Sequence, residues 1–366
     1  MGARVVDLLL LAALFLAPGV VRAQDNTQVE ETRYFYRGLP YGSDASFNPV
    51  RELINGSLGI LQISSRWMPL DEIDWRNGMD ITWKSVSHPA RTVNAYGWEN
   101  FLTSEVIPGQ IRWSNLQYLP NYHLHLIGGG ARHRGFVEWY RDHGFPNPGF
   151  WAAATTALHA VLVETVEHQA AVQPTVDPVA DMLIFDPAGA ILFSSDRVAR
   201  FFSHTLNMSI WSGQPMYNPV QNTIENAGEN YGLHFFFAKD HRAGLFMYWG
   251  MSDLIGVTVR SASGLAWSVG LGGMASELAE EERGTGMSAI YARLKWDAGA
   301  FVHRNGSLLA SIQVSEGWTQ ALRVNLYPGV VRWRGFSPGI YLGARNSDVI
   351  VGLSLATIPL GLAVSQ

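Results

Sequence analysis

The sequence predicts an α+β protein in which a helical block is followed by a C-terminal antiparallel β-barrel-like region of about eight to nine strands. Between residues 111 and 205, apolar stretches with helical spacing are separated by proline and glycine. From about residue 230 onward, apolar and polar residues alternate in short segments, which is the pattern of strands. We therefore divide the chain into residues 1–23, 24–110, 111–205 and 206–366.

Residues 1–23 have the pattern of a secretory signal peptide. Arg4 supplies a basic start, an apolar run follows, and Val21-Arg22-Ala23 offers a cleavage site before Gln24. The alternative is a single membrane anchor, but the run is shorter than the roughly 20 residues that a spanning helix needs. We therefore expect the chain to be exported.

Residues 24–110 are expected to mix short segments. The phrase "FNPVRELINGSLGILQI" predicts a helix that begins after Asn48-Pro49, because proline suits the first helical turn. The phrase "RTVNAYGWENFLTSEVI" has a helical pattern that ends at Pro108.

Residues 111–205 contain the helical block. Its helical phrases are "YHLHLIGGGARHRGFVEWYRDHG", "GFWAAATTALHAVLVETVEHQAAV", "DPVADMLIF" and "DPAGAILF". The glycine run in the first phrase lacks the Gly-Lys-Ser/Thr ending of a phosphate-binding loop. Gly128, Gly129 and Gly130 instead predict close packing between helices.

Residues 206–366 form the predicted β region. In "LLASIQV", Ile312 and Val314 lie on one face of the predicted strand, and Ser311 and Gln313 lie on the other. Similar short segments are "YGLHFFFA", "AGLFMYWG", "LIGVTVRS", "GLAWSVGLG", "MSAIYARLKWDAG", "ALRVNLY", "GIYLGAR" and "DVIVGLSL". Alternation leaves open which face is wet, because the apolar face points inward in a soluble barrel and outward in a membrane barrel. Export and the high aromatic share of 12%, with 13 Trp, favour the membrane orientation.

The composition excludes several classes of protein. The chain has 26 basic and 31 acidic residues, and this net charge of −5 argues against a nucleic-acid partner. There is no cysteine, which excludes disulfides, a thiol nucleophile and cysteine-ligated metals. Outer-membrane lipid is the expected partner, and the sequence does not tell whether there is a protein partner.

The segment from Leu162 to Gly189 carries an unusual number of acids for an apolar stretch. No lysine or arginine occurs between Asp142 and Asp196. Asp177 and Asp186 each precede a proline, which predicts that both cap the start of a helix.

The other acids have no capping role. Glu164, Glu167 and His168 have the spacing of one helix face, and Asp181 lies about one turn after Asp177. Carboxylates in apolar surroundings are costly unless they are paired, metal-bound or protonated. The favoured explanation is pairing with the flanking arginines, which are Arg132, Arg134, Arg141, Arg197 and Arg200. The alternative is a catalytic acid/base cluster of Glu164, Glu167, His168 and Asp181.

A metal site is a further alternative. Its candidate ligands are His123, His125, Glu167 and His168. His123-x-His125 would share a strand face, but no HExxH spacing completes a zinc motif. No cofactor-binding motif is recognised, and a divalent metal is the only cofactor left open.

Several phrases together resemble a known family. They are "YGSDASFNPVRELINGSLGILQ", "YGWENFLTSEVIPG", "LPNYHLHLIGGG", "EWYRDHG", "VETVEH" and "PTVDPVADMLIFDPAG". Their order over roughly residues 40–240 is similar to an uncharacterised bacterial envelope family, domain of unknown function 3943. The resemblance implies an envelope location and carries no activity. The phrase from Pro174 to Gly189 is also similar to the helical core of VanZ-like membrane domains, although the arginine usual near the threonine is missing.

Three hypotheses follow from the sequence. The first is an exported cell-envelope protein of structural or transport role, placed in the outer membrane rather than the periplasm. The second is a membrane-interface enzyme that acts on a lipid or cell-wall component through the Glu/His/Asp cluster. The third is a soluble periplasmic binding protein that uses the barrel as a ligand cup.

Overall fold

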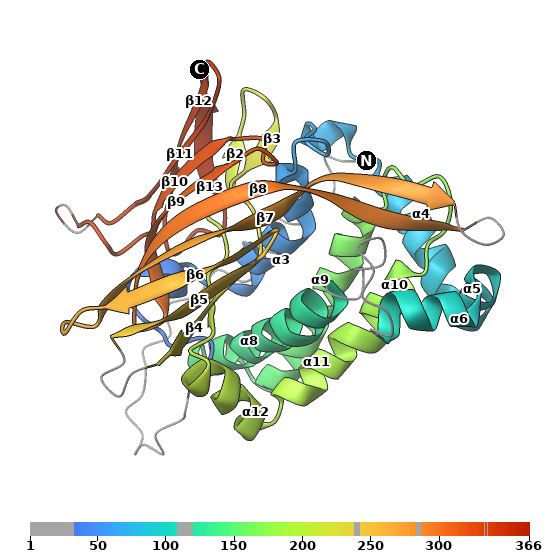
Figure 1. Ribbon diagram of the computed structural model, residues 1–366, viewed down its shortest axis with the longest axis horizontal. Coiled ribbons are helices and arrows are strands. Elements are labelled where there is room, and N and C mark those ends of the chain that lie inside the picture. The colour runs from blue at the N-terminus through green and yellow to red at the C-terminus, as the bar shows by residue number, and fades with distance from the viewer. Residues whose placement is uncertain (1–32, 108–119, 238–241, 283–286, 333, 335) are drawn as a thin grey trace.

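A computed structural model describes residues 33–107, 120–237, 242–282, 287–332, 334 and 336–366. The predicted signal peptide, residues 1–23, and the predicted helix end at residue 108 lie outside these residues. Within them, helices precede a sheet, so the predicted α+β class is confirmed (Figure 1).

The helical part begins earlier than residue 111. The helix expected after Asn48-Pro49 is present, and the Asn48 side chain accepts a hydrogen bond from the Arg51 amide at 2.9 Å. The helical elements are α2 (Gly42–Ser46), α3 (Pro49–Gly59), η1 (Ile60–Gln62), η2 (Leu70–Glu72), α4 (Trp75–Ser87), α5 (Pro89–Tyr96), α6 (Trp98–Phe101), η3 (Leu102–Val106), η5 (Asn121–Gly129), α8 (Gly130–Asp142), α9 (Pro148–Glu167), α10 (Asp177–Ala180), η6 (Asp181–Phe185), α11 (Asp186–Phe193), α12 (Asp196–Arg200) and η7 (Phe201–Thr205).

The nine segments that alternate in the sequence are all strands, β4 to β12. The sheet has 13 strands in the described chain rather than eight or nine. β1, β2 and β3, with 2 or 3 residues each, are too short to show a pattern, and the 5-residue β13 is a further strand absent from the prediction. The strands are β1 (Ser209–Ile210), β2 (Met216–Asn218), β3 (Thr223–Glu225), β4 (Asn230–Phe236), β5 (Ala243–Gly250), β6 (Ser252–Arg260), β7 (Leu265–Glu282), β8 (Ser288–Arg304), β9 (Ser307–Ser315), β10 (Leu322–Leu326), β11 (Gly339–Arg345), β12 (Asp348–Ser354) and β13 (Gly361–Ser365).

The sheet is a single antiparallel meander from β4 to β13 with short strands at both ends. Its order is β1-β4-β5-β6-β7-β8-β9-β10-β11-β12-β13-β2-β3, and only the β13–β2 pair is parallel among the described pairs. The hydrogen-bonded ladder therefore does not close into a barrel. Residues 211–215 nevertheless connect β1 at one end of the meander to β2 at the other. The sheet consequently curves around this connection (Figure 1).

On several strands the polar side chains point inward and the apolar ones outward. On β9, Ser311 and Gln313 are buried while Ile312 and Val314 are exposed, and on β10 Arg323 is buried beside the exposed Leu322. The interior also holds large apolar side chains, such as Phe246 and Phe301.

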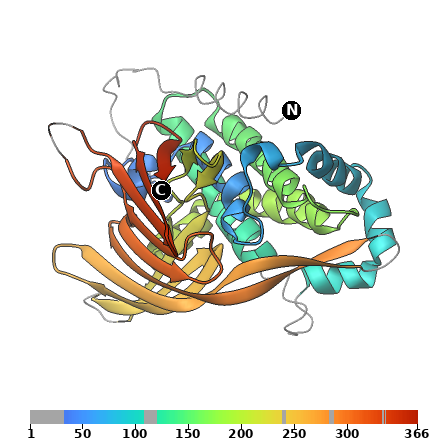
Figure 2. The same cartoon turned by 90° about the horizontal axis from the view of Figure 1, so that it is seen from above.

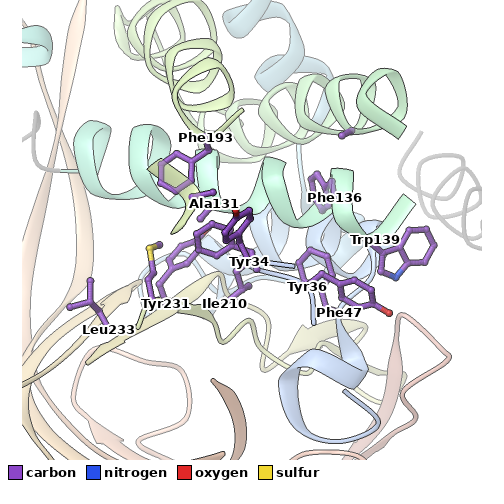
Figure 3. Close-up of a cluster of buried hydrophobic side chains, with 14 of the residues drawn as sticks. Tyr34, Tyr36, Phe47, Ala131, Phe136, Trp139, Phe193, Ile210, Tyr231 and Leu233 are labelled. Atoms are coloured by element: carbon purple, nitrogen blue, oxygen red, sulfur yellow. The ribbon is translucent and has the colours of Figure 1, made fainter. Parts of the chain in front are cut away.

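The helices pack on the open side of the sheet. α8 carries Phe136 and Trp139 into an aromatic core that includes Tyr34, Ile210 and Tyr231 (Figure 3). The predicted close packing at the glycine run is confirmed, because a Cβ at Gly130 would lie 2.4 Å from the Phe193 ring and 2.7 Å from the Gly189 carbonyl oxygen. The helical block and the sheet therefore share one core.

The β7–β8 hairpin extends beyond the other strands and reaches across the helices (Figure 2). Met287, at the start of β8, packs in a cluster with Val93, Tyr96 and Phe101 of α5 and α6. The hairpin thereby ties the far end of the helical block to the sheet.

Candidate functional site

Helix α9 supplies the first half of the site. It begins at Pro148 after Asn147, whose left-handed backbone has φ 52°, and it packs against α3, α4 and α8. Among the described helices, α9 alone is long and apolar enough to cross a membrane, but half of its most apolar stretch is buried inside the protein, as in ordinary core helices. Its last turn places Glu164 in the interior, followed by the fully buried His168.

The chain then turns back and brings a second set of polar groups to His168. Thr175 Oγ1 lies 2.9 Å from His168 Nε2, and Asp177 Oδ2 lies 3.9 Å from the same nitrogen. Glu164 Oε2 lies 3.4 Å from His168 Nδ1. One ligand atom each from Glu164, His168 and Asp177 can be chosen so that all three lie within 4.8 Å of one another.

The tautomer of His168 is fixed by its surroundings. Nδ1 lies 2.9 Å from the Glu164 carbonyl oxygen, which can only accept a hydrogen bond. Nδ1 therefore carries the hydrogen and donates it. In the neutral ring, Nε2 keeps its lone pair and accepts from the Thr175 hydroxyl.

His125 forms the second half of the site. Its Nδ1 lies 3.1 Å from Asp186 Oδ1, and its Nε2 lies 3.3 Å from Asp181 Oδ2. Burial alone would lower the pKa of His125, but the Asp186 carboxylate outweighs it and raises that pKa. Both ring nitrogens of His125 lie beside acids, Asp186 at Nδ1 and Asp181 at Nε2.

The predicted strand for His123-x-His125 is wrong, because both histidines lie in the π-helical element η5. Residues two apart on a helix do not share a face, so the two side chains point in different directions. His123 Nε2 lies 3.5 Å from Asp253 Oδ1 of β6, outside the cluster.

The buried acids of the site resist ionisation. Burial raises the pKa of Asp181 well above its usual range, and the Asp177 carboxylate adds to the rise. The pKa of Glu164 is raised for the same two reasons. Asp181 Oδ1 and Glu164 Oε2 are buried without a hydrogen-bond partner in the described structure. Each of these oxygens therefore lacks the partner that a buried polar atom normally has.

The favoured explanation from sequence, pairing with flanking arginines, is wrong for this cluster. Arg132 pairs with Glu229 at 2.5 Å, and Arg134 pairs with Glu138 at 2.9 Å. Arg197 and Arg200 line a surface hollow of about 370 Å³. Among the ion pairs of the described residues, no arginine meets Glu164, Asp177 or Asp181.

The predicted capping roles of Asp177 and Asp186 are also wrong. Val176, immediately before Asp177, is the N-cap residue of α10. Asp177 is therefore in the first turn of the helix, near His168. Asp186 lies within a continuous helical run from η6 into α11, where Phe185 already has helical backbone angles. Both aspartates thus face histidines, Asp177 near His168 and Asp186 beside His125.

The four candidate catalytic residues do not contribute equally. Glu164, His168 and Asp181 gather in the cluster as expected. Glu167 is half-buried at its edge, where burial and then Asp177 raise its pKa while His168, His125 and Arg66 lower it. Asp177, Asp186 and Thr175 are the members that the sequence did not suggest.

A second network, absent from the sequence predictions, joins the helices to the sheet. Glu229 precedes β4 and lies 2.7 Å from His159 Nε2 of α9 as well as beside Arg132 of α8. These charges hold the pKa of Glu229 at about 2 even though burial alone would raise it. No local signal marks this acid, since its partners lie 70 and 97 residues away.

The arrangement suits proton transfer or metal binding. A histidine of fixed tautomer beside acids that hold their protons can act as a general base and acid. The same imidazole and two carboxylates are also a donor set for a divalent ion.

Comparisons of the chain with family models, with curated proteins and with solved structures returned no match.

Proposed function

We propose that the protein is an exported bacterial outer-membrane protein in which the outer face of the sheet contacts lipid and the helical block is anchored to the sheet's open side. The single observation that carries this proposal is the continuous apolar outer face of the strands. The segment 1–23 and the envelope-family resemblance support the same location.

The outer face is apolar in an unbroken row from strand to strand. The register aligns Leu245 of β5 with Val257, Val269, Ala300, Ile312, Val324, Leu342, Val351 and Val364 in turn. Ile255 and Leu271, in the neighbouring row, are each 65% exposed. A soluble monomer seldom exposes an apolar patch of more than a few hundred Å². A lipid environment removes this cost.

Several polar side chains of the inner face are hydrogen-bonded to one another. Asn325 Oδ1 accepts from the side-chain amides of Asn226 at 2.7 Å and Gln214 at 3.1 Å. Ser268 donates to Thr258 at 2.9 Å on the neighbouring strand. Polar groups that face inward are the arrangement of membrane barrels.

Some strands of the meander are long enough to cross a bilayer, whereas β4 and β10 to β13, with 5 to 7 residues each, are shorter. β5 has 8 residues and β6 and β9 have 9, which rise roughly 26–30 Å before any tilt. The apolar band of outer-membrane barrels is about 25 Å tall.

The interior of the sheet favours a structural role over a pore or ligand cup. A cavity beside Trp211, Tyr248 and Arg323 measures about 10 Å³, which is room for about one water molecule. Trp211 also packs against Phe246 and Phe301, with ring centroids 5.9 and 5.7 Å apart. The filled interior therefore speaks against the third hypothesis.

A membrane-interface enzyme remains a second candidate because of one specific observation, the buried cluster of His125, His168, Glu164 and Asp181. The oxygens of buried structural acids normally accept hydrogen bonds, whereas Asp181 Oδ1 and Glu164 Oε2 have no hydrogen-bond partner in the described structure. This candidate requires that Asp181→Asn abolish an activity while the chain still reaches the membrane.

Fractionation tests the proposal. We expect the full chain, expressed in a bacterium, to sediment with outer membranes, to resist extraction by carbonate and to dissolve in detergent. A periplasmic marker protein serves as the control in the same cells. Recovery of the folded chain in the soluble periplasmic fraction, without detergent, would refute the proposal.

A further inference from the structure

We propose that Glu164, His168 and Asp177 bind a divalent first-row transition-metal ion, with Zn²⁺ the best match. Their ligand atoms lie within 4.8 Å of one another and come from the end of α9 and the start of α10. This inference goes beyond the proposed membrane placement and does not depend on it.

One of the separations approaches that of a formed site. Zinc binds nitrogen and oxygen ligands at about 2.0–2.2 Å, so two donors on a tetrahedral ion lie roughly 3.3 Å apart. His168 Nε2 and Asp177 Oδ2 are 3.9 Å apart. Asp177 is only partly buried, so its side chain can rotate toward the ring without displacing the helix.

His168 is oriented as a metal ligand would be. A ligating histidine usually donates its second ring N–H to a carbonyl or carboxylate, which fixes the tautomer. Here Nδ1 donates to the Glu164 carbonyl oxygen at 2.9 Å and directs the Nε2 lone pair toward Asp177. The Thr175 hydroxyl lies 2.9 Å from Nε2, and a bound ion would displace it from the ring nitrogen.

A second observation points to a missing cation. Glu164 Oε2 is buried, with the residue 1% exposed, and has no hydrogen-bond partner among the described atoms. Asp181 Oδ1 is also buried without a hydrogen-bond partner, with the residue 4% exposed. Asp181 lies close enough to Glu164 and Asp177 to interact electrostatically with both. Buried carboxylate oxygens are normally paired or coordinated. The described arginines that could have filled this role pair elsewhere, with Glu229, Glu138 and Asp196.

The donor set selects the class of ion. One imidazole and two carboxylates suit zinc and its neighbours better than Mg²⁺ or Ca²⁺, which prefer oxygen alone. Two ionised carboxylates and a neutral imidazole also balance a charge of +2. A site with three protein ligands leaves a position for water, and Asp181 would accept a hydrogen bond from that water through its unpaired oxygen.

Zinc binding to the full chain tests the proposal. The detergent-solubilised protein is stripped with a chelator, dialysed against Zn²⁺ near neutral pH and analysed for bound metal by elemental analysis and calorimetric titration. We expect about one tightly bound Zn²⁺ per chain, and a loss of affinity of at least roughly 10–100-fold in Glu164→Gln and in Asp177→Asn. Glu72→Gln is the matched control, since it removes an exposed acid on η2 that is outside the cluster.

Two outcomes overturn the proposal. One is a stripped wild-type chain that binds no Zn²⁺. The other is a folded Glu164→Gln or Asp177→Asn protein that binds Zn²⁺ as well as the wild type does, which would place the metal on surface histidines. If a variant fails to fold, Co²⁺ binding by the wild-type chain decides: visible absorption bands of a low-symmetry site, lost on addition of Zn²⁺, support the proposal, and their absence refutes it.

Discussion

At the scale of single residues, the protein buries acids under two different conditions. Glu229 is stabilised as an anion by Arg132 and His159. Glu52 of α3 is more deeply buried but has weaker support, because among the described residues only Ser212 donates a side-chain hydrogen bond to it, at 2.5 Å. Burial, with Glu229 nearby, raises the pKa of Glu52 from 4.5 to about 7. The surroundings, and not the residue type, decide which acid is charged.

Glu52 therefore makes the stability of the fold depend on pH. Between pH 4.5 and about 7 the folded chain holds a proton that the unfolded chain releases, so stability falls as pH rises through this window and stays lower above it. The pKa difference corresponds to about 3 kcal/mol. We expect Glu52→Gln to reduce this fall and to be the more stable protein at pH 8, as measured by denaturant unfolding across pH.

Glu72→Gln is the control for this prediction, because Glu72 is exposed on η2 and its loss should leave the pH profile unchanged. A Glu52→Gln protein whose stability falls with pH as steeply as that of the wild type would contradict the assignment.

At the scale of elements, the site depends on how closely two helices approach. α4 crosses α9 at Gly78, where a Cβ would lie 1.9 Å from the Thr165 carbonyl oxygen. Thr165 immediately follows Glu164, so this contact helps to fix the end of α9. Asn77, next to Gly78, donates to the Gln169 and Ala171 carbonyl oxygens at 2.9 Å and holds the start of the following turn.

Replacing Gly78 with alanine should separate these helices. The new methyl group meets backbone and cannot be accommodated by a side-chain rotation, so we expect a loss of stability of about 1–3 kcal/mol. Gly149→Ala, in the first turn of α9, is the matched control because a Cβ there meets nothing within 4 Å, and it should be neutral or slightly stabilising. The denaturant concentrations at half-unfolding of the two variants are compared. Equal values would contradict the prediction, because they would mean that α4 can shift away from α9 without a loss of stability.

Two local sequence patterns, Asp-Pro and His-x-His, led to wrong predictions for short elements. Asp-Pro marks a helix start in most contexts, but here the helix from η6 runs through Asp186 without a break. His123-x-His125 alternates like a strand, yet it lies in a helix because the surrounding segment packs against α8 and α11. Local sequence could not distinguish these cases, since tertiary packing decides the outcome for short segments.

At the scale of the whole molecule, the strands present a continuous apolar exterior. The helices also expose apolar side chains, such as Trp83 of α4 and Phe150 of α9, beside charged pairs such as Asp80 and Lys84. The proposed membrane placement of the strands predicts that their exterior responds to an added charge differently from a helix surface.

An arginine on the strand exterior tests that difference. Val257 lies in the middle of β6 and is 54% exposed, so Val257→Arg would place a charge within the lipid band. We expect a cost of about 2–4 kcal/mol for folding into lipid vesicles. Ala90→Arg on the exposed surface of α5 adds the same charge and should change stability by less than about 0.5 kcal/mol. Equal small effects would indicate that both surfaces face water.

The sequence by itself determined the α+β class, the change from helices to strands and nine of the strands, because hydrophobic periodicity is a local property of each segment. It also located Glu164, His168 and Asp181, since acids in an apolar stretch are conspicuous. Only the tertiary structure decided which face of the sheet is polar, which acids meet which histidines, and that Arg132 and Arg134 pair elsewhere. These outcomes depend on contacts between residues far apart in the chain, and period and spacing carry no information about such contacts.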